Sequence, residues 1–220
     1  MAKLSYQNPQ DRKYERQGFL RQLFGPSQAE IWNLLAQSLN AQFKPGSAFK
    51  GSKVIAEVGE WSVTIDTYTE SSGESSTTYT RIRAPYVNRD GMRFTLYHAS
   101  VFSSLGKMLG MQDIEVGYSR FDEEMVVRGE NEAKIRHLLA DRELCDLILA
   151  QKHLRIDVKD DEGWFGTKFP EHVDELQFLV YGTIKDLDRL HALFDLFSRM
   201  LHRLCAIGSA YENDPGIELN

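Results

Sequence analysis

The spacing of apolar residues changes from helix-like to strand-like and back along the chain. Near the start, apolar side chains recur every three or four positions between residues 31 and 39, which predicts an amphipathic helix. Ser27 and Glu30 precede it at the spacing of a capping box, in which each side chain accepts a hydrogen bond from the other residue's backbone N–H. Pro45-Gly46 marks the end of this element, because neither residue continues a helix readily.

A second and longer helical stripe lies near the other end of the chain. Its apolar positions run from Ile184 to Leu204, with Thr183 as the expected N-cap and Gly208 as the stop. A helix of this length extends about 36 Å, which is enough to cross several strands. We therefore expect it to pack on a sheet and to be followed by a polar tail, residues 211–220.

Between these helices the period falls to two, which is typical of half-buried strands. The predicted strands are 54–58, 61–69, 77–84, 93–98, 114–116, 124–127, 154–158 and 176–181. The predicted short helices are 101–109, 131–139 and 142–151. Short turns at Gly59-Glu60 and around Asp90-Gly91 favour hairpins, so the first four strands should form a meander, with a longer loop over 70–76. The prediction is an α+β fold on an antiparallel sheet.

The chain divides into a basic arm (1–25), one α+β domain (26–210) and the polar tail. The arm carries more cations than anions although the whole chain has a net charge of −6. A helix in the arm would be cationic on one side and apolar on the other, which suits packing on its own domain, on a partner or on an anionic membrane surface. Each half of the domain, 50–110 and 111–208, ends with strands followed by a helix, which suggests a weak duplication.

Composition narrows the class of protein. No apolar run is long enough to span a bilayer and the first residues are too polar for a signal peptide, so we expect a cytoplasmic protein. The negative net charge argues against nucleic acid as a partner. Cys145 and Cys205 fall in predicted helices, without the spacing of a disulfide framework or a zinc site. No nucleophile motif is present, and we expect no metal or cofactor.

Strand alternation separates two faces of the predicted sheet. One parity places apolar residues inward: Trp61, Val63, Ile65, Ile82, Phe94 and Leu96. The other parity gathers the candidate ligand-binding residues: Asp66, Tyr68, Tyr79, Arg81, Arg83, Arg93 and Tyr97. Guanidinium groups flanked by tyrosines can bind a carboxylate or phosphate, with Asp66 as acceptor or internal partner. An exposed sheet face with cross-strand ion pairs would show the same pattern, so both interpretations remain open.

Four segments resemble a group of uncharacterised bacterial proteins of unknown function. They are Tyr79–Pro85, Phe94–Tyr97, Gly110–Gly117 and Phe121-Asp122, and the resemblance covers residues 50–150 best. It implies a bacterial source and an intracellular domain, and it assigns no activity.

Three functional hypotheses follow. The first is a non-enzymatic binding or interaction module that uses the Tyr/Arg face to hold an anionic small molecule or a protein partner. The second is a hydrolase-type enzyme that combines Asp66, Arg81 and Arg83 with the acidic cluster between Asp113 and Glu124, although no catalytic motif supports it. The third is peripheral membrane association through residues 12–24.

Overall fold

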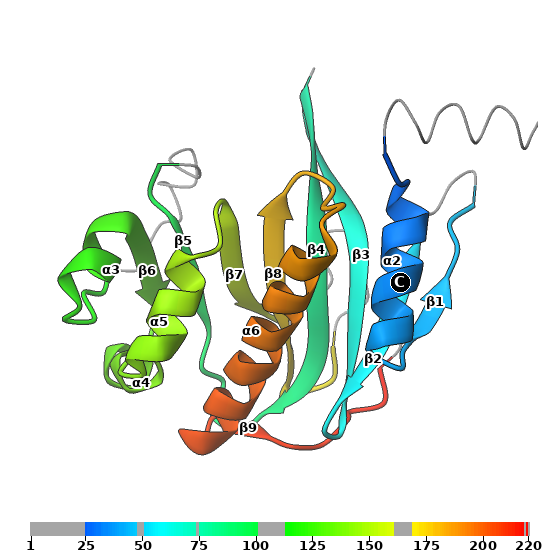
Figure 1. The fold of residues 1–220 in the computed structure, drawn as a ribbon. Helices are drawn as coiled ribbons and strands as arrows, with labels where there is room; N and C mark the ends of the chain where they lie inside the picture. The colour runs from blue at the N-terminus through cyan, green and yellow to red at the C-terminus, as the bar shows by residue number, and fades with distance from the viewer. Residues whose placement is uncertain are drawn as a thin grey trace, which may run out of the picture.

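The computed structural model describes residues 25–47, 51–73, 75–100, 113–160, 169–217 and 219. Within these ranges the chain is an α+β fold, in which nine strands form one antiparallel sheet and five helices accompany it (Figure 1). The helices are α2 (Gln28–Ser38), α3 (Ser119–Glu124), α4 (Glu132–Leu138), α5 (Arg142–Leu149) and α6 (Leu187–Ala206). The strands are β1 (Gln42–Lys44), β2 (Lys53–Val58), β3 (Trp61–Ser72), β4 (Ser75–Asn88), β5 (Phe94–His98), β6 (Met125–Gly129), β7 (Leu154–Lys159), β8 (Val173–Tyr181) and β9 (Ala210–Tyr211).

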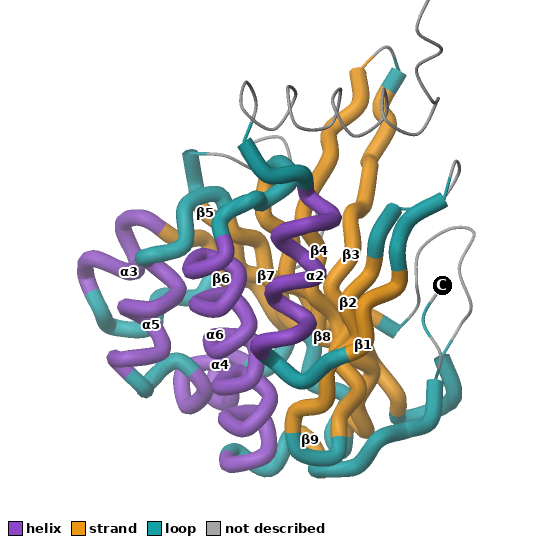
Figure 2. Tube along the Cα trace, turned by 45° about the vertical axis from the view of Figure 1, so that its right-hand side comes forward, coloured by secondary structure: helices purple, strands orange, loops and turns teal. Residues whose placement is uncertain are grey.

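The helices lie on one side of the sheet. α6 crosses its middle and α2 lies beside α6, whereas α3, α4 and α5 gather toward the β5–β6 end (Figure 1). The rotated view separates the helical layer from the strands (Figure 2). The predicted apolar parity forms part of the buried core: Trp61, Val63, Ile65, Ile82, Phe94 and Leu96. Phe178 of β8 meets Phe197 of α6 edge to face, with ring centroids 4.8 Å apart, so the long helix packs on the sheet as predicted.

Capping residues explain where the two main helices begin. The predicted capping box is present in α2, because Ser27 N–H donates to the Glu30 carboxylate and Glu30 N–H donates to the Ser27 hydroxyl. The predicted cap of α6 is wrong: Asp186, and not Thr183, accepts from a first-turn N–H, that of Arg189, at 3.0 Å. The segment before α6 is instead held to β4, where Thr80 Oγ1 accepts from Ile184 N–H at 2.9 Å.

The strand order is β1-β2-β3-β4-β8-β7-β5-β6, with β9 beside β4. The predicted meander is therefore correct from β2 to β4 and wrong at β5, because β8 and β7 lie between β4 and β5. β8 is buried at every position except its last, as expected for a strand at the centre of a sheet. The predicted loop 70–76 is also shorter than expected, since β3 continues to Ser72 and β4 begins at Ser75.

Some predictions fall outside the described residues. The helix predicted at 101–109 and the basic arm up to residue 24 belong to this group. Within the described ranges, no helix has both the length and the apolar character needed to cross a bilayer.

Candidate functional site

The face of the sheet away from the helices carries the predicted polar residues. No described helix packs on this face (Figures 1 and 2). Asp66 of β3 lies opposite Arg81 of β4, and Tyr68 lies opposite Tyr79. Arg83 follows Arg81 on the same side of β4 because strand side chains alternate. The strand register therefore brings most of the predicted site together.

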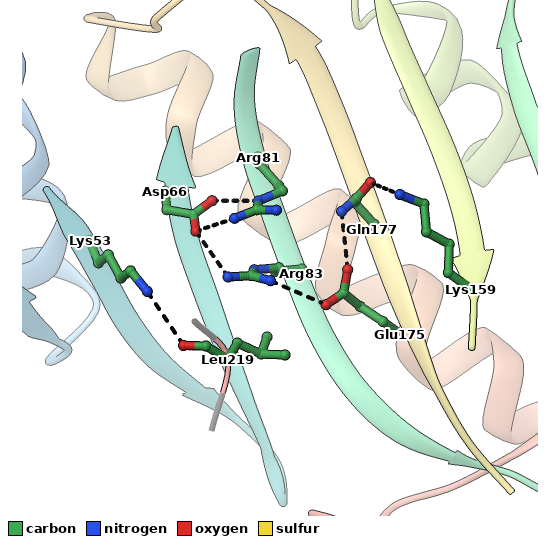
Figure 3. A network of polar contacts seen from close by, with 8 residues as sticks. All are labelled: Lys53, Asp66, Arg81, Arg83, Lys159, Glu175, Gln177 and Leu219. Carbon is green, nitrogen blue, oxygen red and sulfur yellow. Dashed lines mark hydrogen bonds and ion pairs between the residues drawn. The ribbon is translucent and has the colours of Figure 1, made fainter. Parts of the chain in front are cut away.

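Asp66 is the centre of this arrangement (Figure 3). Arg81 donates from Nε and Nη2 to the two Asp66 oxygens, each at 2.7 Å. Arg83 Nη2 donates to Asp66 Oδ2 at 3.2 Å. The Arg83 side chain is only 1% exposed, so this is a buried cluster of charges. A two-pronged guanidinium contact of this kind is among the stronger polar interactions and fixes side-chain geometry.

The cluster continues across the sheet into β8 and β7. Arg83 Nη1 lies 3.5 Å from Glu175 Oε2, so the guanidinium bridges two carboxylates. Gln177 Nε2 donates to Glu175 Oε1 at 3.0 Å, and Lys159 Nζ donates to Gln177 Oε1 at 2.7 Å (Figure 3). We call these residues the charged network: Asp66, Arg81, Arg83, Glu175, Gln177 and Lys159. It links four strands through side chains alone.

Burial and charge act on the network in opposite directions. Burial lowers the pKa of Arg81, but the hydrogen bonds and charge of Asp66 outweigh it, so the pKa is raised overall. Burial lowers the pKa of Lys159, and the nearby charges of Asp157 and Glu175 offset this only in part. The difference has a simple cause: Arg81 donates directly to a carboxylate, whereas Lys159 donates to a neutral amide.

An aromatic row crosses three strands next to the network. Tyr68 and Tyr79 stack with ring centroids 6.5 Å apart, and Tyr181 meets Tyr79 edge to face at 6.2 Å. His153 follows Tyr181 at 6.3 Å. Tyr68 is 37% exposed and Tyr181 is 59% exposed. We call these four residues the tyrosine row. The Arg81 guanidinium lies 5.1 Å from the Tyr68 ring centroid, which joins the row to the network.

Two predicted site residues occupy different surroundings. Tyr97 shares the face but is buried, and it packs with Tyr79 and Leu179 in a small apolar cluster. Arg93 is separate from the network: its Nη2 lies 3.1 Å from Asp174 and its Nη1 lies 2.9 Å from Asp160. Arg93 precedes β5, so strand alternation does not fix its direction. It lines a cavity of about 310 Å³ at another part of the molecule.

Other members of the face were absent from the predicted site: Arg155, Asp157, Lys159, Glu175, Gln177 and Tyr181. The alternation of side chains along β7 and β8 is the sequence pattern that places these residues on one face. What the sequence does not supply is the pairing of β4 with β8, and without that pairing these residues have no connection to Arg81 or Arg83.

The carboxylates that the hydrolase hypothesis would use already have partners within the protein. Both oxygens of Asp66 already accept from guanidinium groups, so this carboxylate serves as the partner of two internal cations. In the acidic cluster, Asp122 accepts from the backbone N–H groups of Val116, Gly117 and Tyr118 and so organises a loop. Asp113 pairs with Arg128 at 2.6 Å. These carboxylates have structural partners.

Thiol and metal chemistry are equally without support in the part of the chain that the structure describes. Burial raises the pKa of the Cys145 thiol to about 12, so it is a poor nucleophile. No group of three or more His, Cys, Asp or Glu among the described residues is placed to hold a metal ion. Two histidines of α6 have contacts within the protein: His191 Nε2 lies 2.9 Å from Ser38 Oγ, and His202 packs against Trp61.

Comparison with known proteins adds no functional information, because no family model, curated protein or solved structure matches this chain.

Proposed function

We propose that this protein is a non-enzymatic interaction module that binds a protein partner through the tyrosine row and the adjoining Arg81. The main support for this proposal is that Tyr68 and Tyr181 are exposed on a face that no described helix covers. Tyrosine and arginine are the residues that most often dominate binding energy at protein interfaces. That the protein is bacterial and cytoplasmic stays a prediction from the sequence.

The charged network supports this proposal by making the face rigid. Asp66 holds Arg81 in one orientation, and Arg81 lies against the Tyr68 ring. A side chain fixed before binding loses less conformational entropy when the partner arrives. The network thus contributes to recognition by positioning the row.

A protein partner fits better than an anionic small molecule. Arg81, Arg83 and Arg93 all lie against carboxylates of the chain itself, so an added anion would have to displace them. Neither Arg81, Arg83 nor a residue of the tyrosine row lines the cavities of about 310 and 430 Å³; Arg93 lines the first of them, together with its partners Asp160 and Asp174. Small molecules usually occupy enclosed pockets, whereas proteins bind shallow aromatic surfaces.

The test is selection of binding peptides from a random display library against the immobilised full chain. Selected peptides should lose about tenfold or more in affinity for a Tyr68→Ala/Tyr181→Ala variant, since each ring is an exposed anchor. Affinities would be measured by titration calorimetry with synthetic peptides.

Tyr211 supplies the matched control. It is 49% exposed and stacks with Arg89, but it lies on β9, away from the row. Tyr211→Ala should leave peptide affinity unchanged. The proposal is wrong if the selected peptides bind the double variant as tightly as the wild type, or if only Tyr211→Ala weakens them.

A further inference from the structure

β3 and β4 extend beyond the rest of the sheet as a two-stranded ribbon. β2 pairs with β3 only as far as Ile65, and the β8 side of β4 is occupied only from Thr78 onward. Between these points and the turn, β3 and β4 pair with each other and with no other described strand, up to Ser72 opposite Ser75. Figure 1 shows this ribbon projecting past the neighbouring strands.

The hydrogen bonds of β4 show which backbone groups of β3 face outward. Thr80 N–H donates to Gly182 O, and Gly182 N–H donates to Thr78 O, so even-numbered residues here point toward β8. Odd-numbered residues of β4 therefore point toward β3, because backbone groups alternate in direction along a strand. Since Tyr79 lies opposite Tyr68, the even residues of β3 bond to β4.

It follows that Thr69 and Ser71 direct their backbone N–H and C=O away from β4. Gly51, just before β2, lies against the Thr67 side chain, so the chain runs beside β3 as far as this residue. No described strand pairs with Thr69 or Ser71 on the outer side, and both residues are exposed. Among the residues that the structure describes, this is an open strand edge of the kind to which extended peptides add.

Such a ribbon is weakly stabilised by itself. Beyond the Tyr68–Tyr79 stack its cross-strand pairs join polar residues, as in the 3.0 Å hydroxyl contact between Thr69 and Thr78. A hairpin of two strands without a buried apolar face is marginal in water. A third strand along β3 would supply the missing backbone hydrogen bonds.

We infer that an extended segment of a partner protein adds to the outer edge of β3 beside Thr69 and Ser71. This rests on the proposed function and specifies its geometry, because Tyr68 of the tyrosine row belongs to the same strand. The added strand would lie next to Tyr68 on one face and next to Thr69 on the other.

Charge favours a basic segment. Residues 67–80 contain glutamates and no lysine or arginine, and the whole chain carries a net charge of −6. Glu70 is exposed on β3. A lysine or arginine opposite Glu70 would be favourable, whereas the edge of a second, equally acidic copy would not. The occupant is therefore a basic, extended segment of another protein.

The probe is a short synthetic peptide in which lysine alternates with valine, added to the isotope-labelled full chain. Amide hydrogen exchange, followed by NMR, should slow about tenfold at Thr69 and Ser71 when the peptide saturates the protein. The amides of Tyr68 and Glu70 should change little, because they already donate toward β4. A glutamate-for-lysine version of the peptide should give no protection.

Thr69→Pro removes the outward N–H without removing a β3–β4 backbone bond, since Thr69 points away from β4. It should weaken peptide binding about tenfold. Ser76→Pro is the matched control: Ser76 lies opposite Ser71 and directs its N–H to the opposite edge of the ribbon. This variant should bind the peptide like the wild type.

Several outcomes would overturn strand addition. The first is unchanged exchange at Thr69 and Ser71 with the peptide bound, and the second is equal weakening by the two proline variants. Protection that appears without peptide and grows with protein concentration would assign the edge to a second copy. If Tyr181→Ala weakens binding while exchange at these amides stays unchanged, the proposed function stands and strand addition fails.

Discussion

Arg83 shows how strongly a single buried charge can matter in this fold. Its guanidinium lies between Asp66 and Glu175, and each of these side chains is also nearly fully buried. Arg83→Met keeps most of the side-chain volume but removes both ion pairs of Arg83. Glu175 then loses this cation, and Asp66 keeps only its contact with Arg81. Breaking a buried ion pair costs about 3 kcal/mol or more. We expect the free energy of unfolding, measured by urea denaturation, to fall by about this amount.

An exposed pair provides the comparison for this prediction. Arg120 and Glu124 are one turn apart on α3, with exposures of 63% and 42%. Arg120→Met should change the free energy of unfolding by about 0.5 kcal/mol or less, because water screens the pair. Equal effects of the two substitutions would contradict the structural role assigned to Arg83.

At this scale the alternation of strand residues predicts the site only for residues that lie inside a regular strand of the structure, and Arg93 lies just before one although the predicted strand included it. Asp66, Arg81 and Arg83 lie on one face because they belong to long, regular strands. Arg93 does not join them, since it precedes β5 and turns toward Asp174. Whether arginines on such a face are buried or exposed depends on what lies beside them, and a local pattern carries no information about that.

Between elements, the clearest polar connection joins α5 to α6. Asp141 is the N-cap of α5 and accepts from Leu144 N–H at 3.1 Å. Arg199 of α6 donates to both oxygens of the same carboxylate, at 3.1 and 3.0 Å. Burial raises the pKa of Asp141, but the hydrogen bonds from Arg199 and Leu144 outweigh it, so the pKa falls below its ordinary value of 3.8.

A lowered carboxyl pKa makes this connection dependent on pH. The stabilisation is complete above the unfolded-state pKa and is lost as pH falls through the lower folded-state pKa. Asp141→Asn keeps a good capping side chain but removes the charge that Arg199 contacts. We expect it to lower the free energy of unfolding by about 1 kcal/mol at neutral pH.

The pH dependence of the unfolding free energy distinguishes the contribution of the Asp141 charge from its role as the N-cap of α5. The difference between Asp141→Asn and the wild type should begin to shrink as pH drops to about 3.8 and should approach zero below the lower folded-state pKa, because the wild-type carboxyl is then protonated in the folded protein too. Urea denaturation over a pH series would measure it. A difference that persists unchanged at acid pH would mean that the amide disturbs packing and that charge is not the cause.

Helix starts are predictable from sequence only when a single capping residue is available. Ser27 and Glu30 form the predicted capping box of α2. Near α6, Thr183 and Asp186 both suit an N-cap, and the structure uses Asp186. Thr80, far away in sequence, holds the backbone of Ile184 and so delays the helix. A contact between distant segments therefore decides the boundary.

For the molecule as a whole, strand order is the feature that the sequence leaves open. Local turns link β2, β3 and β4, and each pairing follows from a short connection. The pairing of β4 with β8 joins Thr80 to Val180, and no turn signal specifies so distant a partner. The apolar composition of β8 predicts a buried strand but not its neighbours. The charged network depends on this pairing, which is why sequence patterns identify only its β3–β4 half.

The same strand order predicts a gradient of local stability across the sheet. β8 is central, with β4 and β7 on its two sides, and it is buried along nearly its whole length, so Leu176 and Phe178 should exchange their amide hydrogens only on global unfolding. Thr69, Ser71 and Ser76 direct their amides to open edges of the ribbon and should exchange fastest among the strand residues. Amide exchange would be measured by NMR at increasing urea. The protection of the β8 amides should fall as urea is added, whereas the exchange of the ribbon-edge amides should not depend on urea. Uniform protection from β8 to the ribbon would mean that the ribbon edges are covered, and strand addition would then have no free edge to use.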